Sequence, residues 1–120
     1  MRVAIVDDHE VFRASVVRLL EDELGIDVVA QGASAQEAVA IAGRMALDVI
    51  VLDWQLPDGN GVDAATAITS MAGAPKVIML TGYATVSVQS DALRSGVALI
   101  LGKDEAAMQL ADAIRGFDAI

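Results

Sequence analysis

The feature that most constrains this chain is the alternation of short apolar runs with longer amphipathic segments. Five runs have the length of a β-strand: 3–6, 28–30, 49–52, 77–80 and 98–101. A segment with the apolar spacing of a helix follows each of them, over about 11–24, 35–45, 62–71, 85–94 and 104–115. Parallel strands need a crossover connection, and a helix is the usual one. The pattern therefore predicts an α/β fold of five strand–helix units.

The run at 49–52 contains no polar residue, which is typical of a central strand covered on both faces. Right-handed crossovers place helices on both sides of such a sheet. We expect a doubly wound, five-stranded parallel sheet in the order 2-1-3-4-5, with 56–61 forming a loop. A chain of 120 residues is long enough for one domain only, so we take 1–120 as a single unit.

Composition excludes several classes of function. The chain has 17 acidic and 8 basic residues and a net charge of −9, which disfavours direct binding to nucleic acid or to an anionic membrane. It has no cysteine, so disulfides, thiolate zinc sites and cysteine nucleophiles are excluded. No signal peptide is recognisable, and no apolar run approaches the ~20 residues of a membrane span. We therefore expect a cytoplasmic location.

Polar residues stand where the predicted strands end: Asp7-Asp8, Asp53, Thr81 and Lys103. Open α/β sheets bind ligands at the carboxyl ends of their strands, so these side chains should converge. Three neighbouring carboxylates repel one another, and Mg²⁺ suits a site of few carboxylates plus phosphoryl oxygens. One carboxylate can act as the nucleophile that forms an aspartyl-phosphate. Lys103 could neutralise phosphoryl charge, and Thr81 could donate a hydrogen bond to a phosphoryl oxygen.

This set of residues resembles the receiver domain of bacterial two-component response regulators, which has the flavodoxin-like (CheY-like) fold, over essentially the whole chain. The resemblance implies that Asp53 is the phosphoacceptor and that a sensor histidine kinase or a phosphotransfer protein is its donor. It implies that Asp8 binds Mg²⁺ directly, that Asp7 assists, often through water, and that the backbone carbonyl of Gln55 is a third protein ligand.

The same resemblance makes Thr81 the switch hydroxyl and Lys103 the lysine that pairs with the phosphate. Such a domain is no conventional enzyme; at most it phosphorylates itself from small donors and loses the phosphoryl group again. Phosphorylation could also lead to a homodimer.

A finer resemblance lies in segment 7–13 and in Asp104, which directly follows the lysine. Both resemble regulators of the NarL/LuxR type. Receivers of that type usually precede a helix-turn-helix domain that controls transcription. Either the protein continues beyond Ile120 into such a domain, or it is a stand-alone receiver.

One position departs from the family. Three residues before the lysine the family usually has Tyr or Phe, and here Ile100 stands there. We expect the conformational readout to differ, with Tyr83 as a candidate to take part instead. The resemblance implies that Gln55 and Tyr83 influence how fast the aspartyl-phosphate hydrolyses, and we expect the bulk of Tyr83 to favour a long-lived phosphoryl state.

Ile100 also keeps open an alternative, a receiver-like interaction module that works without phosphorylation. A haloacid dehalogenase-type phosphatase would need a second Asp where Gln55 stands, and an FMN site would need backbone donors where Asp7 and Asp8 stand. We interpret His9 as a partly exposed residue of the first helical turn rather than as a base or ligand, and Trp54 as packing beside the site.

Overall fold

The computed structural model describes residues 1–82 and 86–118. Its main sheet consists of β1 (Arg2–Val6), β2 (Asp27–Gly32), β3 (Val49–Asp53), β6 (Lys76–Thr81) and β7 (Leu99–Gly102). The strands pair in the order β2-β1-β3-β6-β7, and every pair is parallel. This confirms the doubly wound fold and the strand order predicted from the sequence.

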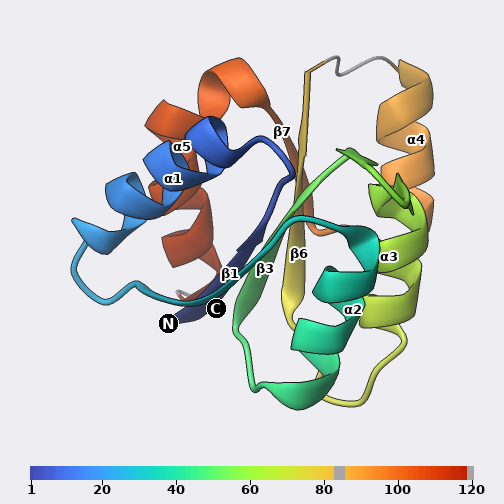
Figure 1. Ribbon diagram of the computed structural model, residues 1–120, viewed down its shortest axis with the longest axis horizontal. Coiled ribbons are helices and arrows are strands. Elements are labelled where there is room, and N and C mark those ends of the chain that lie inside the picture. Colours follow the sequence, from blue (N-terminus) through green and yellow to red (C-terminus); the bar gives the residue numbers. More distant parts are fainter. Residues whose placement is uncertain (83–85, 119–120) are drawn as a thin grey trace.

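In the described part of the chain, five helices cover the two faces of the sheet (Figure 1). On one face lie α1 (Glu10–Glu21) and α5 (Lys103–Asp118). On the other face lie α2 (Ala35–Arg44), α3 (Gly61–Thr69) and α4 (Val86–Arg94). Within the described residues, no helix combines the length and the apolar character that crossing a membrane requires.

The central strands supply both halves of the core, because successive side chains of a strand point to opposite faces. In β3, Val49 and Val51 pack with α1 and α5, whereas Ile50 and Leu52 pack with α2, α3 and α4. All four side chains are buried. The uninterrupted apolar run therefore marks a strand with helices on both sides, as predicted.

The start of α2 shows how local sequence fixes a helix end. Ser34 is the N-cap, and its Oγ accepts a hydrogen bond from the N–H of Glu37 at 3.1 Å. The Glu37 carboxylate reaches back to the N–H of Ala33 at 3.3 Å. The predicted N-terminus is confirmed, with the reciprocal bond displaced by one residue from the usual capping box.

Three sequence predictions were wrong in detail. The segment expected to be a loop contains a small antiparallel hairpin, β4 (Gln55–Leu56) and β5 (Gly59–Asn60). Leu24, the last residue of the segment expected to form the first helix, is 92% exposed, because α1 ends at Glu21 and the chain turns before reaching it. Val11, in the first turn of α1, is also exposed rather than buried.

Candidate functional site

The fold brings the predicted site residues to one edge of the sheet. Asp7 follows β1, Asp53 ends β3 and Thr81 ends β6. Lys103 is the first residue of α5, directly after β7. Asp7, Asp53 and Thr81 are almost wholly buried, at 1–3% exposed. Because parallel strands end at the same edge, residues up to 96 positions apart in sequence share one site.

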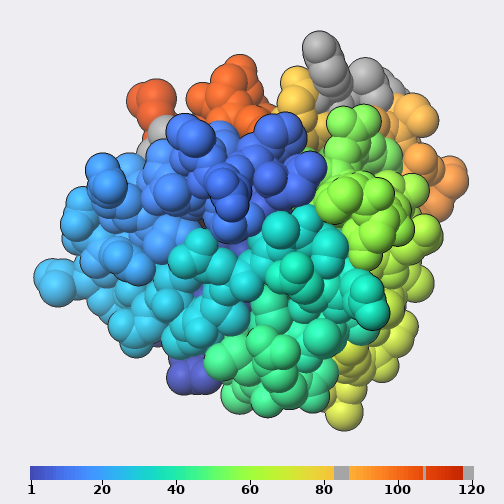
Figure 2. Space-filling view, in the orientation of Figure 1, coloured from blue at the N-terminus to red at the C-terminus, as the bar shows by residue number. Residues whose placement is uncertain are grey.

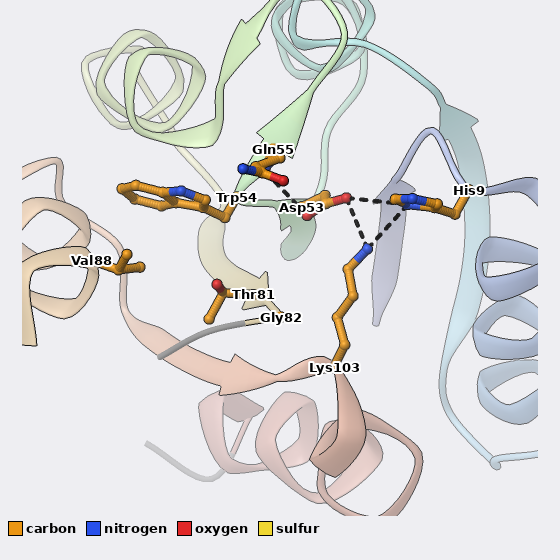
Figure 3. A pocket seen from close by; sticks show the side chains of 8 residues that line it. All are labelled: His9, Asp53, Trp54, Gln55, Thr81, Gly82, Val88 and Lys103. Carbon is orange, nitrogen blue, oxygen red and sulfur yellow. Dashed lines mark hydrogen bonds and ion pairs between the residues drawn. The ribbon is translucent and has the colours of Figure 1, made fainter. Parts of the chain in front are cut away.

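Of these residues, Asp53, Thr81 and Lys103 line a pocket of about 340 Å³ that opens to solvent. Its lining is His9, Asp53, Trp54, Gln55, Thr81, Gly82, Val88 and Lys103. In Figure 3 the Lys103 side chain extends toward Asp53, and the Trp54 ring points away from Asp53 toward Val88. Trp54 therefore lies beside the site, as predicted, and forms one wall of the pocket.

Lys103 lies between two buried carboxylates. Its Nζ is 2.9 Å from Oδ2 of Asp7 and 2.9 Å from Oδ2 of Asp53. It also lies 4.8 Å from the centre of the Phe12 ring. Burial acts to lower the pKa of Lys103, but its close contacts with the negatively charged Asp53 and Asp7 outweigh burial, so that pKa is raised. The ammonium therefore stays charged and neutralises part of the acidic pocket.

The two carboxylates are held differently. Burial acts to raise the pKa of Asp7, but the N–H of His9, 2.8 Å from Oδ1, and the Lys103 ammonium hold it below its usual value. Burial, reinforced by the charge of Asp7, raises the pKa of Asp53 despite its bonds from Lys103 and the Gln55 N–H. Asp53 is thus the more basic carboxylate, which suits a nucleophile.

The pocket also fits a divalent cation. Asp7, Asp8, His9 and Asp53 each offer a ligand atom, and these atoms all lie within 4.8 Å of one another. Oδ2 of Asp7 is buried and finds no hydrogen-bond partner among the residues that the structure describes, its contact with Lys103 being an ion pair only. Clustered carboxylate oxygens with unsatisfied capacity are the ligands that Mg²⁺ prefers.

His9 is partly what the sequence predicted. It is the N-cap residue of α1, and its side chain is 65% exposed. Its Nδ1 nevertheless points into the acidic cluster and lies 3.0 Å from Oδ1 of Asp7. Sequence reasoning missed this contact. The signal available was the position of the histidine directly after two acids.

Two further residues support the site and were missed. Arg13 donates from Nη1 to the backbone oxygen of Asp7 at 2.6 Å, which fixes the end of β1. Asp58, in the turn between β4 and β5, accepts hydrogen bonds from the N–H groups of Ala35 and Gln36 at 2.7 and 2.9 Å. Those two bonds lower the pKa of Asp58 and join the segment after Asp53 to the first turn of α2. Figure 2 shows the two segments side by side.

The three residues expected to modulate the site have three different outcomes. Gln55 lines the pocket and donates its N–H to Asp53 Oδ1 at 3.2 Å. Ile100 is half-buried, pairs with Met79 across the sheet and packs in the core half formed with α2, α3 and α4. Tyr83 lies outside the described residues. The roles assigned to these three residues stay predictions.

Comparison with known proteins gives concordant matches. The family model for the response regulator receiver domain matches residues 3–115. The chain is 36% identical over 119 residues to the DNA-binding transcriptional activator DevR/DosR of Mycobacterium tuberculosis, covering 99% of this chain and 55% of the relative. It is 34% identical over 115 residues to the response regulator UvrY of Escherichia coli, covering 96% of this chain and 53% of the relative.

Solved structures agree. The signal receiver domain of the response regulator NarL from Mycobacterium tuberculosis matches with a TM-score of 0.91 at 28% identity, covering 96% of this chain and 93% of that one. A LuxR-family response regulator from Aurantimonas matches with a TM-score of 0.91 at 30% identity, covering 98% and 84%. The chain spans about half the length of the curated relatives it matches.

Proposed function

The chain belongs to the response regulator receiver domain family and is of the NarL/LuxR type, and from that premise we propose that it is a phosphorylation switch. In this proposal residues 1–120 form one receiver domain. Asp53 accepts a phosphoryl group from a sensor histidine kinase or a phosphotransfer protein. The modified domain then changes its surface and controls an output.

The observation that carries the proposal is the state of Asp53. It is a buried carboxylate with a raised pKa, at the wall of an open pocket, with an ammonium group 2.9 Å away. An Oδ of Asp53 forms a bond to phosphorus while the bond from phosphorus to the donor nitrogen breaks. The electron pair of that bond stays on the nitrogen. Such transfer depends mainly on positioning and on neutralising charge, and Lys103 supplies a fixed positive charge.

A bound Mg²⁺ would complete the site. Asp7, Asp8, Asp53 and the backbone carbonyl of Gln55 would hold it, in keeping with the buried Asp7 oxygen that lacks a hydrogen-bond partner. When bound, Mg²⁺ would supply positive charge to the phosphoryl oxygens. The protein's own residues keep three tasks: Gln55 orients the Asp53 carboxylate, Lys103 contacts it, and Asp7 stays ionised.

The switch follows from the position of the pocket residues in the chain. A phosphoryl group on Asp53 would add negative charge beside Lys103 and Thr81. Thr81 ends β6, shortly before α4, and Lys103 begins α5. A change at either residue would bias the arrangement of those helices, which is a population shift between two conformations. Ile100 supplies no aromatic ring to this change, so Thr81, Lys103 and Tyr83 would carry it.

The proposed output is transcription. One relative is named a DNA-binding transcriptional activator, and this chain covers about half of its length. With a net charge of −9, the present residues are a poor surface for DNA, so a C-terminal domain would make that contact. A stand-alone receiver, with a partner protein or a homodimer as output, is the second form of the proposal.

Incubation with acetyl phosphate and Mg²⁺, followed by mass spectrometry of the intact chain, tests the function. We expect a gain of one phosphoryl group that disappears in Asp53→Asn. Asp63→Asn is the matched control, because it removes an exposed carboxylate of α3 that does not line the pocket, and it should retain the gain. No phosphoryl gain in the wild type from acetyl phosphate or from a phosphorylated histidine kinase would favour the interaction module that works without phosphorylation.

A further inference from the structure

We propose that the imidazole of His9 occupies the acidic cluster of Asp7, Asp8 and Asp53 in the metal-free protein. Mg²⁺ must then displace this imidazole in order to bind. The inference rests on the proposed function, since it concerns the same cation site. It assigns to His9 a task that the phosphoryl-transfer chemistry does not use, namely to set how readily the pocket takes up its metal.

A single atom of His9 carries the argument. Its Nδ1 lies 3.0 Å from Oδ1 of Asp7, 3.3 Å from Oδ1 of Asp8 and 3.7 Å from Oδ2 of Asp53. These are the three carboxylates that would hold the cation. The imidazole therefore contacts in the metal-free protein the groups that a cation would need to share.

The His9 ring and Mg²⁺ cannot contact the same carboxylate oxygens at the same time. Ionised carboxylates only accept hydrogen bonds, whereas the Lys103 ammonium only donates them. We assign the hydrogen to Nδ1 because Asp7 Oδ1, at 3.0 Å, is nearer to it than Lys103 Nζ, at 3.3 Å. An Nδ1 that carries a hydrogen has no lone pair for a metal, and Mg²⁺ prefers oxygen ligands. The ring must therefore leave its position when the cation takes these oxygens.

The structure gives the ring a way out. The side chain of His9 is 65% exposed and makes no helix-capping hydrogen bond, while the His9 backbone is held separately by its N–H bond to Asp7 Oδ1. An open groove of about 570 Å³ lies on one side of it, lined by His9, Val11, Phe12, Ser15 and Lys103. A second groove of about 520 Å³ lies on the side of Asp8, Glu10 and Arg13. The imidazole can swing into either groove without disturbing the core.

Displacement lowers the apparent affinity for the cation by the fraction of molecules in which the pocket is free. If the seated ring is favoured roughly 3:1 to 9:1 over the swung-out ring, Mg²⁺ binds about 4- to 10-fold more weakly than it would without the imidazole. His9→Ala should therefore bind Mg²⁺ about 4- to 10-fold more tightly than the wild type.

A Mg²⁺ titration followed by the fluorescence of Trp54, which lines the same pocket, measures this affinity. The control is Arg18→Ala, which removes a positive charge from the same helix but away from the pocket, and it should change the affinity by less than about twofold. The gain in His9→Ala should persist at high salt, because a contact within 3.7 Å is screened far less than a distant charge.

A second readout uses the wild type alone. His9 is the single histidine of the chain, so its ring gives one assignable set of NMR signals. Because Nδ1 lies 3.3 Å from Lys103 Nζ, we expect a nuclear Overhauser effect between the ring and the end of the Lys103 side chain without metal, and its loss at saturating Mg²⁺.

The outcomes separate the inference from the function on which it rests. Equal or weaker Mg²⁺ affinity in His9→Ala, or an Overhauser effect that survives saturation, overturns the displacement while phosphorylation of Asp53 still stands. If wild type and His9→Ala both fail to bind Mg²⁺, the displacement is overturned, and the acetyl phosphate experiment decides separately whether Asp53 is an acceptor.

Discussion

Replacing Gly61 with alanine should lower the stability of the domain and slow phosphoryl uptake by Asp53. Gly61 is the first residue of α3, is buried, and donates its N–H to the backbone oxygen of Trp54 at 2.7 Å. A Cβ added at this position would lie 2.6 Å from the backbone oxygen of Asp53. It would also lie 3.1 Å from Cε of Met79 and 3.3 Å from Cα of Trp54.

The size of the effect follows from which neighbours can move. Non-bonded heavy atoms pack at about 3.5 Å, so the new methyl is roughly 0.9 Å too close to the Asp53 oxygen. Met79 can change its rotamer, but the Asp53 oxygen belongs to the end of β3 and moves only with the main chain. Overpacking of this kind costs about 1–3 kcal/mol, and we expect a value of about 2–3 kcal/mol because the backbone is involved. The melting temperature should fall by about 10 °C.

Urea unfolding followed by Trp54 fluorescence measures the free energy of unfolding, and the acetyl phosphate reaction measures the acceptor. We expect phosphoryl uptake to slow by at least about tenfold, since the displaced main chain carries the nucleophile. Gly43→Ala is the matched control: its Cβ would meet nothing within 4 Å, and in α2 it should stabilise by up to about 1 kcal/mol. A loss below about 0.5 kcal/mol in Gly61→Ala, with an unchanged denaturant slope, would refute the steric argument.

Three further predictions concern charge. Asp53→Asn should stabilise the metal-free protein by roughly 0.5–2 kcal/mol at pH 7. Because folding raises the pKa of Asp53, ionisation of this carboxyl lowers the free energy of unfolding as the pH rises above the unfolded pKa of 3.8. The gain from the substitution should therefore vanish in urea titrations near pH 3. Lys103→Met should lower the free energy of unfolding by about 2–4 kcal/mol, because it leaves Asp7 and Asp53 without their ammonium partner. Saturating Mg²⁺ should restore part of this stability, and thermal melts with Mg²⁺ and with EDTA measure the difference. Asp58→Ala should lower the melting temperature by a few degrees near pH 7 and progressively less as the pH falls through the lowered pKa of that carboxyl, whereas equal effects at both ends of the pH range would speak against its bonds to α2.

The sheet could be predicted because its signal is long and redundant. Each central strand is an apolar run, and each run is followed by a segment with helical spacing, so topology rules leave few alternatives. The β4–β5 hairpin could not be predicted in the same way. Its strands, Gln55–Leu56 and Gly59–Asn60, are two residues long, which is too short for any periodicity. Leu24 was misassigned because its spacing fits a helix that has already ended.

The convergence of Asp7, Asp53 and Lys103 could be predicted because it follows from strand ends alone. The contacts of Arg13 and Asp58 could not be predicted. Each is a hydrogen bond to a backbone group, and because every residue has the same backbone groups, the sequence does not indicate which one is the partner. His9 falls between these cases. The sequence shows that His9 directly follows Asp7 and Asp8, but the direction of its ring depends on the N-cap geometry of α1.

The uneven support of the two buried carboxylates gives the proposed switch its direction. Asp7 accepts the backbone N–H of His9, a bond that stays in place whatever happens to Asp53, so Asp7 keeps part of its stabilisation when Lys103 moves. Lys103 Nζ lies 2.9 Å from both carboxylates, so it should move toward whichever of the two groups carries more negative charge. After phosphorylation that group would be the modified Asp53. Because Lys103 begins α5 and Thr81 ends β6, the pull would act on two points of the backbone at once. A switch built in this way does not need an aromatic ring at position 100 to move α4 and α5, which makes Ile100 compatible with a working phosphorylation switch.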